Sequence, residues 1–278
     1  MYEILEKERF SPNVYYLRVR AEEIAKNRKP GQFVIVQLPG ELSERVPLTI
    51  ADADPEEGCI MLVIQTTGAS TYKLCQLEVG EKLGAILGPL GTPSEIKKAK
   101  HVVAVAGGIG AAPLYPIVQA HKKLGNYITV INGARNKDLV VFEDRLRAVC
   151  DELIITTDDG SYGRKALVTE PLKELCESDN PPDLAIAIGP PIMMKFAAKT
   201  TEPFGIKTIV SLNTIMIDGT GMCGCCRVEV GGETKFACVD GPDFDGHKVN
   251  FDNMMERMRI FKPQEEDSKH KCKIGLKH

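Results

Sequence analysis

Four cysteines gathered in one short stretch are the residues of this chain best suited to metal chemistry. Cys223, Cys225, Cys226 and Cys238 lie close together, and Asp218 precedes them in the spacing D-x4-C-x2-C-x11-C. With Cys in place of the Asp, this is the spacing of plant-type [2Fe–2S] sites. Thiolates are soft, strongly donating ligands that suit iron. The pattern therefore predicts a [2Fe–2S] cluster, with Cys225 as a bystander between the ligand positions.

Other interpretations of this loop remain open. Zinc is the main competing metal, although a zinc site usually has two C-x2-C pairs or added His ligands. A loop without metal is the third possibility, and Asp218 can also cap a turn before Gly219. Three glycines in the loop allow the backbone to wrap tightly around a ligand: Gly219, Gly221 and Gly224.

A glycine-rich turn follows the apolar run HVVAVA, which begins at His101. Its residues Gly107, Gly108 and Gly110 precede a helical pattern, and such a turn lets a dinucleotide pyrophosphate approach the backbone. A tight turn without a ligand gives the same pattern. Two further loops that follow strands support nucleotide binding, because open α/β sheets bind ligands at the carboxyl ends of their strands.

The first of these loops contains Asp158 and Asp159, and the second contains Gly189, Pro190 and Met193. Carboxylates accept hydrogen bonds from a ribose and repel a 2′-phosphate, which favours NAD(H) over NADP(H). The two Asp residues are alternatively solvated turn residues.

A cation and a hydroxyl share an apolar segment nearer the N-terminus, Arg45-Val-Pro47-Leu48-Thr49. Downstream, Gly68, Ser70 and Thr71 stand at the start of an expected helix. A cation and helix N-terminal amides together suit a pyrophosphate. Arg45 is alternatively an ordinary surface charge.

The elements that must position these residues follow two different sequence patterns. Residues 1 to about 97 contain short β-branched runs, such as 32–38 and 60–65, separated by Gly and Pro, which predicts an antiparallel β-barrel with one short helix near 70–77. From His101, continuous apolar runs (101–106, 127–131, 153–157, 184–188 and 208–212) alternate with helical segments such as 139–149 and 167–176. That alternation predicts an α/β Rossmann-like domain with a parallel sheet buried on both faces. A helix is expected over 251–260, followed by a loosely ordered polar tail over 262–278.

Composition limits the function classes. The chain has 278 residues and a net charge of −3, so there is no electrostatic case for nucleic acid or anionic membrane as a partner. The first ten residues are charged rather than apolar, and no stretch approaches the length of a membrane span. We therefore expect a cytoplasmic protein whose other cysteines are buried thiols.

In order along the chain, these motifs resemble the ferredoxin–NADP reductase-like flavoproteins. More narrowly, the chain resembles the electron-transfer subunits of dihydroorotate dehydrogenase. It also resembles the small (alpha) subunits of NADH-dependent reduced ferredoxin:NADP oxidoreductases, which are also known as sulfide dehydrogenase beta subunits. The resemblance lies in the segments ERVPLTIAD, GPLGTPS, TTDDGSYG, GPPIMMK and MIDGTGMCGCCRVEVGGETKFACVDGP. In the small (alpha) subunits, an Asp takes the place of the first cluster Cys.

The resemblance implies four parts: an FAD-binding β-barrel over residues 1–97, an NAD-binding α/β domain over 98–212, a [2Fe–2S] loop over 213–245, and a C-terminal helix and polar tail over 246–278. It implies that Asp218, Cys223, Cys226 and Cys238 ligate the cluster. The flavin contacts that it implies are Arg45, Pro47, Leu48, Thr49, Gly68, Ser70 and Thr71, with Thr49 near the reacting ring. The wider family has Arg-x-Tyr-Ser/Thr, whereas Arg45 stands four residues before Thr49 and Leu48 takes the Tyr position.

The implied chemistry is hydride exchange between NAD(H) and FAD, followed by one-electron transfer through the cluster. The implied partner is a larger flavoprotein subunit with FAD and [4Fe–4S] clusters, in a heterodimer that couples NADH, NADPH and ferredoxin by electron bifurcation. Two alternatives remain: an electron-transfer subunit for dihydroorotate dehydrogenase or sulfide dehydrogenase, and a non-enzymatic iron–sulfur regulatory module.

Overall fold

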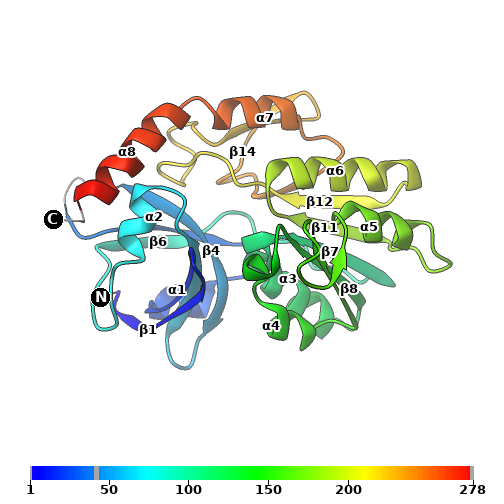
Figure 1. The fold of residues 1–278 in the computed structure, drawn as a ribbon, viewed down its shortest axis with the longest axis horizontal. Coiled ribbons are helices and arrows are strands. Elements are labelled where there is room, and N and C mark those ends of the chain that lie inside the picture. Colours follow the sequence, from blue (N-terminus) through cyan, green and yellow to red (C-terminus); the bar gives the residue numbers. More distant parts are fainter. Residues whose placement is uncertain (1, 41–43, 276–278) are drawn as a thin grey trace.

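The computed structural model describes residues 2–40 and 44–275. An antiparallel sheet comes first, a mainly parallel sheet follows it, and a small cysteine-rich segment with two helices ends the chain (Figure 1). The change of sequence pattern near residue 100 matches the start of the second sheet at His101.

The first sheet has the strand order β1-β2-β5-β4-β3-β6 with antiparallel neighbours. Its elements are β1 (Ile4–Ser11), β2 (Val14–Arg20), α1 (Glu22–Asn27), β3 (Phe33–Gln37), β4 (Arg45–Asp54), β5 (Cys59–Gln65), α2 (Ala69–Leu74) and β6 (Ala85–Leu90). The amide of Ile4 donates to the carbonyl of Glu81 over 2.9 Å, so β1 is joined to the segment that leads into β6. The sheet thereby closes on itself, and the predicted barrel is confirmed.

The second sheet has the order β10-β9-β8-β7-β11-β12-β15, and its pairs are parallel except for β12 with β15. Its strands are β7 (His101–Gly107), β8 (Tyr127–Ala134), β9 (Glu152–Thr157), β10 (Arg164–Lys165), β11 (Leu184–Ile188), β12 (Lys207–Ser211) and β15 (Asp243–Asp245). The order reverses between β7 and β11. In open α/β sheets, such a reversal leaves a crevice at the carboxyl ends of the strands, where ligands bind.

Helices cover both faces of this sheet (Figure 1). They are α3 (Ala111–Lys123) and α4 (Glu143–Arg147) on one face, and α5 (Thr169–Cys176) and α6 (Pro191–Thr201) on the other. Strand β7 is buried along its first six residues because both faces are covered, as its continuous apolar sequence predicts.

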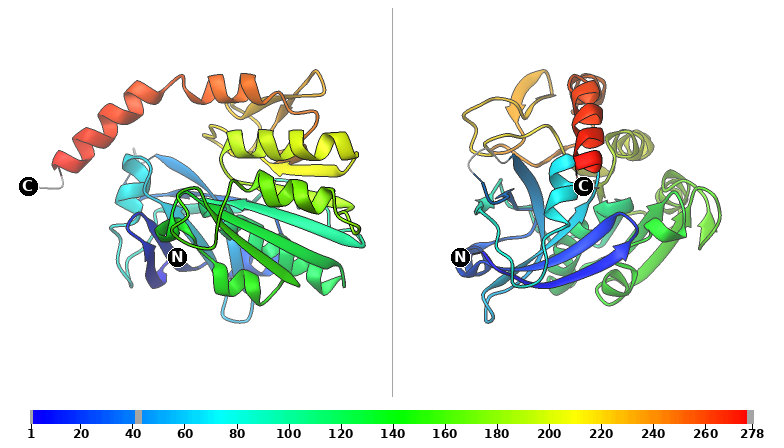
Figure 2. Two further views of the ribbon diagram at one scale, coloured as in Figure 1. Left: turned by 45° about the vertical axis from the view of Figure 1, so that its right-hand side comes forward. Right: turned by 60° about the vertical axis from the view of Figure 1, so that its left-hand side comes forward.

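The cysteine-rich segment contains a hairpin of β13 (Arg227–Val230) and β14 (Glu233–Phe236). After the hairpin the chain returns to the second sheet as β15, then forms α7 (Phe251–Met258) and α8 (Lys262–Gly275). Helix α8 runs from α7 toward the barrel and packs against α2 (Figure 2).

Two expectations about helices were wrong. The tail is helical over Lys262–Gly275, because i,i+4 ion pairs such as Lys271–Asp267 (2.7 Å) and packing against α2 stabilise it; residues 276–278 lie outside the described part. The helix expected over 139–149 shrinks to Glu143–Arg147. Phe142 precedes it with φ 64°, so the chain cannot enter that helix earlier.

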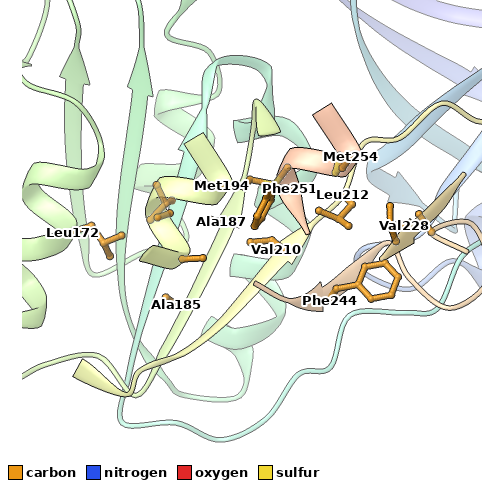
Figure 3. Packing of buried hydrophobic residues seen from close by; sticks show 14 of the residues in the cluster. Leu172, Ala185, Ala187, Met194, Val210, Leu212, Val228, Phe244, Phe251 and Met254 are labelled. Carbon is orange, nitrogen blue, oxygen red and sulfur yellow. The ribbon is translucent and has the colours of Figure 1, made fainter. Parts of the chain in front are cut away.

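One hydrophobic cluster joins all three parts of the chain. Figure 3 shows members of it from the second sheet, its helices and the cysteine-rich segment. The cluster contains Phe33 of the barrel, Val105 and Val210 of the second sheet, and Cys226 and Val228 of the cysteine-rich segment. Among residues 2–40 and 44–275, no helix is long and apolar enough to cross a membrane.

Candidate functional site

A cavity of about 1080 Å³ lies where the barrel meets the carboxyl ends of β7 and β11. Ten of the residues that the sequence singled out line it: Pro47, Leu48, Thr49, Gly107, Gly108, Gly110, Asp158, Gly189, Pro190 and Met193. The fold therefore brings the barrel motif and the three strand-end loops to one site, as the topology requires.

The barrel side of the cavity is built on β4. Thr49 pairs with Phe33 of β3, and both line the cavity together with Gln65 at the end of β5. Thr49 is half-buried, so its hydroxyl lies at the boundary between the barrel core and the open volume. Arg45, at the exposed start of the same strand, does not line the cavity.

The glycines of the sheet side have two distinct uses. A Cβ on Gly107 would lie 2.6 Å from the sulfur of Met193, and one on Gly110 would lie 2.1 Å from the carbonyl of Ile188. These glycines allow the two loops to pack against each other. Gly108 has a φ of +56°, and no atom of the described residues lies within 4 Å of the position that its Cβ would take, so its backbone faces open space. Open backbone of this kind is what a pyrophosphate needs to approach a glycine-rich turn.

The structure separates the two acidic residues after β9. Asp158 lines the cavity. Asp159 does not, and its Oδ1 accepts a hydrogen bond from the amide of Ser161 over 2.9 Å. Hydrogen bonds from Ser161 hold the pKa of Asp159 below its usual range. Only Asp158 is placed to contact a ligand.

Sequence reasoning missed Arg135, an exposed cation that lines the cavity just after β8. Its signal was available, because the run that becomes β8 also ends in a loop at the carboxyl edge of the sheet. The same cavity is lined by Asn213, Thr214 and Met216, which lead from β12 toward the cysteine-rich loop.

Residues expected to hold a flavin pyrophosphate gather at the start of α2, outside the cavity lining. The hydroxyl of Thr71 accepts hydrogen bonds from the amides of Thr67 (3.1 Å) and Gly68 (3.0 Å). Ser70 donates its hydroxyl hydrogen bond to the carboxylate of Glu44. The carboxylate of Glu44 therefore lies at the start of α2 and accepts the hydrogen bond that the Ser70 hydroxyl was expected to donate to a pyrophosphate.

The cysteine-rich loop brings two candidate ligands together through their sulfurs and holds Asp218 at the backbone of a third, Cys223. The sulfurs of Cys226 and Cys238 are 3.2 Å apart and buried. The carboxylate of Asp218 accepts hydrogen bonds from the amides of Cys223 and Thr220, each over 2.9 Å. Within the described residues, no three His, Cys, Asp or Glu side chains form a group that fits one metal ion.

Local hydrogen bonds lower the pKa of two side chains in this loop, and burial raises the pKa of a third. Backbone hydrogen bonds, that to Thr220 foremost, lower the pKa of Asp218. Backbone hydrogen bonds near Cys225 and Asp218 lower the pKa of the exposed Cys223. Burial, assisted by the neighbouring Cys226, raises the pKa of Cys238 to about 12.

Two family models match the chain. The iron–sulfur cluster binding domain of dihydroorotate dehydrogenase B matches residues 213–250, and the oxidoreductase NAD-binding domain matches residues 104–199. With the barrel and the shared cavity, these matches define an NAD-binding oxidoreductase of the ferredoxin reductase fold that carries an iron–sulfur domain.

Proteins of similar sequence define the family of this oxidoreductase more narrowly. The chain is 43% identical over 266 residues to a protein of Thermotoga maritima described as a homologue of the dihydroorotate dehydrogenase B (NAD(+)) electron transfer subunit, covering 96% of this chain and 93% of that protein. It is 46% identical over 286 residues to an uncharacterized protein of Clostridium beijerinckii, covering 100% of this chain and 96% of the relative. The chain belongs to the family of dihydroorotate dehydrogenase B electron-transfer subunits and their homologues.

A solved structure extends the likeness to the whole fold. The chain aligns with a chain of NADH-dependent reduced ferredoxin–NADP oxidoreductase with a TM-score of 0.92 and 42% identity, covering 98% of this chain and 97% of that one. The family resemblance predicted from the motifs is thus confirmed.

We expect Asp158→Asn to weaken the preference for NADH over NADPH by about tenfold, because removing the carboxylate removes repulsion of a 2′-phosphate. Asp159→Asn is the matched control, since Asp159 does not line the cavity. The measurement is the titration of flavin reduction with each nucleotide. Equal effects of the two substitutions would contradict the expected contact of Asp158 with the ribose.

Proposed function

We propose that this chain is the FAD- and [2Fe–2S]-containing electron-transfer subunit of an NADH-dependent reduced ferredoxin:NADP oxidoreductase. The observation that carries the proposal is the alignment of nearly the whole chain with a subunit of that enzyme at 42% identity. An Asp, rather than a Cys, at the first position of the cluster motif supports the same choice.

The residues of the cavity suit a flavin and a nicotinamide nucleotide that meet inside it. Pro47, Leu48 and Thr49 approach from the barrel, and Gly108 and Pro190 approach from the strand ends. A flavin held there would supply the chemistry that accepts the two electrons of a hydride together and releases them singly. The chain's task is to hold the two ligands in contact and to exclude water from between them.

The cysteine-rich loop suits a two-iron cluster better than a single ion. In a [2Fe–2S] site with four protein ligands, each iron takes two of them. Cys226 and Cys238, whose sulfurs lie 3.2 Å apart, suit one iron. The Asp218 carboxylate, which accepts from the backbone amide of Cys223, suits the other iron together with that cysteine, whereas a zinc ion needs at least three ligands at one position. Asn213, Thr214 and Met216 line the cavity and lead into this loop, which supports a cluster position next to the proposed flavin site.

The proposed partner is a larger flavoprotein subunit with its own FAD and [4Fe–4S] clusters, joined to this chain in a heterodimer. A second candidate function, electron transfer to a dihydroorotate dehydrogenase, is favoured by the names of relatives such as the Thermotoga maritima protein. The partner subunit distinguishes the two functions.

Affinity purification of the tagged chain from its native host is the direct test. We expect a co-purifying flavoprotein with [4Fe–4S] clusters, and a complex that reduces NADP⁺ with NADH only when reduced ferredoxin is also supplied. Co-purification of a dihydroorotate dehydrogenase would favour the second function. A chain that binds no flavin and is not bleached by NADH would exclude both.

Thr49→Ala should slow NADH-driven flavin reduction by roughly ten- to a hundredfold, because a hydroxyl beside the reacting ring is lost. Thr49→Ser keeps the hydroxyl and is expected to retain most of the rate. Stopped-flow absorbance at matched flavin occupancy measures both. Identical rates in all three proteins would remove Thr49 from the reaction site.

Asp218→Cys should keep two irons per chain and shift the reduction potential and the electron paramagnetic resonance spectrum, because a thiolate donates more strongly than a carboxylate. Asp218→Ala should lose iron or bind it weakly. Cys225→Ser is the matched control and should leave iron content and spectrum unchanged. Wild-type spectra in both Asp218 variants would show that its carboxylate only caps the turn.

A further inference from the structure

A second cavity, of about 770 Å³, lies at the opposite end of the parallel sheet, where the strands begin. Leu184 and Lys207, the first residues of β11 and β12, line it, as does the 92–100 segment that joins the barrel to β7. Nothing in the proposed function uses this cavity.

Three polar side chains lie between the two cavities. Ser94 and Asp243 line the second cavity, and Ser211 lines the nucleotide cavity. The hydroxyl of Ser94 donates to Oδ2 of Asp243 over 2.6 Å. Ser211 lies directly opposite Asp243 in the β12–β15 ladder, so both side chains leave the sheet on the same face.

The side chains of the neighbouring pair in that ladder point to the opposite face of the sheet. Val210 and Phe244 pair with each other and join the hydrophobic cluster (Figure 3). Because side chains alternate along a strand, Ser211 and Asp243 point to the other face. A carboxylate and two hydroxyls are thus gathered at the junction of the barrel, the second sheet and the cysteine-rich segment.

The carboxyl of Asp243 is unusual in its surroundings. Its Oδ1 is buried and accepts no hydrogen bond from the described residues in this conformation, while the Ser211 hydroxyl lies near enough to act on the carboxyl. Burial raises the pKa of Asp243, and the opposing influence of the Ser94 and Ser211 hydroxyls is smaller. A buried acceptor without a partner is costly, and a proton on the carboxyl removes the charge that makes it so.

Other charged side chains line the second cavity, and within the described residues none of them forms an ion pair with Asp243. They are Glu95, Lys97, Lys98, Lys100, Asp183, Lys207 and Asp245. Glu95 pairs with Lys97 (2.6 Å) and Lys207 (3.3 Å). Burial and the two hydroxyls, not these charges, account for the shifted pKa of Asp243.

We propose that Ser211, Asp243 and Ser94 form a proton relay that connects the nucleotide cavity with the second cavity. The proposal rests on the proposed function. NADH delivers a hydride, which is two electrons and one proton, whereas an iron–sulfur cluster carries electrons only. For each hydride that enters, one proton must therefore leave the nucleotide cavity by another route.

Each step moves one proton and no electron. The Ser211 hydroxyl takes a proton from the nucleotide cavity, turns toward Asp243 and passes its own proton to Oδ1. The carboxyl and the Ser94 hydroxyl, which donates to Oδ2 at rest, then rotate, so that the carboxyl gives its proton to Ser94 Oγ and Ser94 releases its own into the second cavity. At each oxygen one O–H bond forms as another breaks, so the three side chains are restored when the hydroxyls and the carboxyl rotate back.

Asp243→Asn is the first test, because it keeps the shape of the side chain and removes the proton that titrates. Asp245→Asn, two residues along the same strand, is the matched control. In the FAD- and cluster-loaded chain, we expect NADH-driven flavin reduction to stay at the wild-type rate in Asp243→Asn. Reoxidation by ferricyanide should slow by at least about tenfold and lose its solvent deuterium isotope effect.

A second test of the relay measures the protonation of Asp243 directly and does not depend on flavin chemistry. The infrared spectrum of the flavin-free chain should contain a protonated carboxyl band that persists to higher pH than that of exposed Asp side chains. The band should disappear in Asp243→Asn and remain in Asp245→Asn. Ser94→Ala should keep the band but slow reoxidation, and Ser94→Thr should restore the rate.

Wild-type reoxidation rates in both Asp243→Asn and Ser94→Ala would overturn the relay, as would the absence of a band that depends on Asp243. A wild-type chain that NADH does not reduce at all would instead refute the proposed function. The two failures are therefore distinguishable.

Discussion

One hydrophobic cluster sets the relation among the three parts of this molecule. Phe33 and Ile35 of the barrel, Val103 and Val105 of β7, and Cys226 of the cysteine-rich loop are buried in it together. Electrons pass between bound groups only over short distances, so a chain that transfers them needs its parts held rigidly. A shared close-packed core meets that need, because packed interiors resist deformation.

The same packing explains why much of the fold could be predicted from the sequence. Strands such as Leu184–Ile188 are buried on both faces, and a continuous apolar run is the direct signature of that burial. The cavity-lining glycines and Asp158 were predictable because the topology sends the carboxyl ends of parallel strands to one edge. Local pattern and global fold agree at these positions.

Prediction failed where a residue's role depends on distant partners. Nothing local marks Oδ1 of the half-buried Asp243 as buried, since the surroundings of this carboxyl include Ser94, which is far away in the sequence. The polar tail was expected to lack order because its sequence has no apolar face, yet ion pairs and the contact with α2 make it a helix. Asp159 resembles Asp158 in sequence, and only the turn geometry separates them.

Strand β15 has a consequence for how the chain is made. It pairs with β12 and covers the hydrogen-bonding edge of a sheet whose other strands are all synthesised earlier. An exposed edge strand is a template for pairing with other chains. During translation, the nucleotide-binding sheet therefore keeps an open edge until residues 243–245 emerge, and the iron–sulfur segment closes it. The segment with the cluster motif thus replaces a five-residue edge strand by a three-residue one, which is a poorer template for pairing.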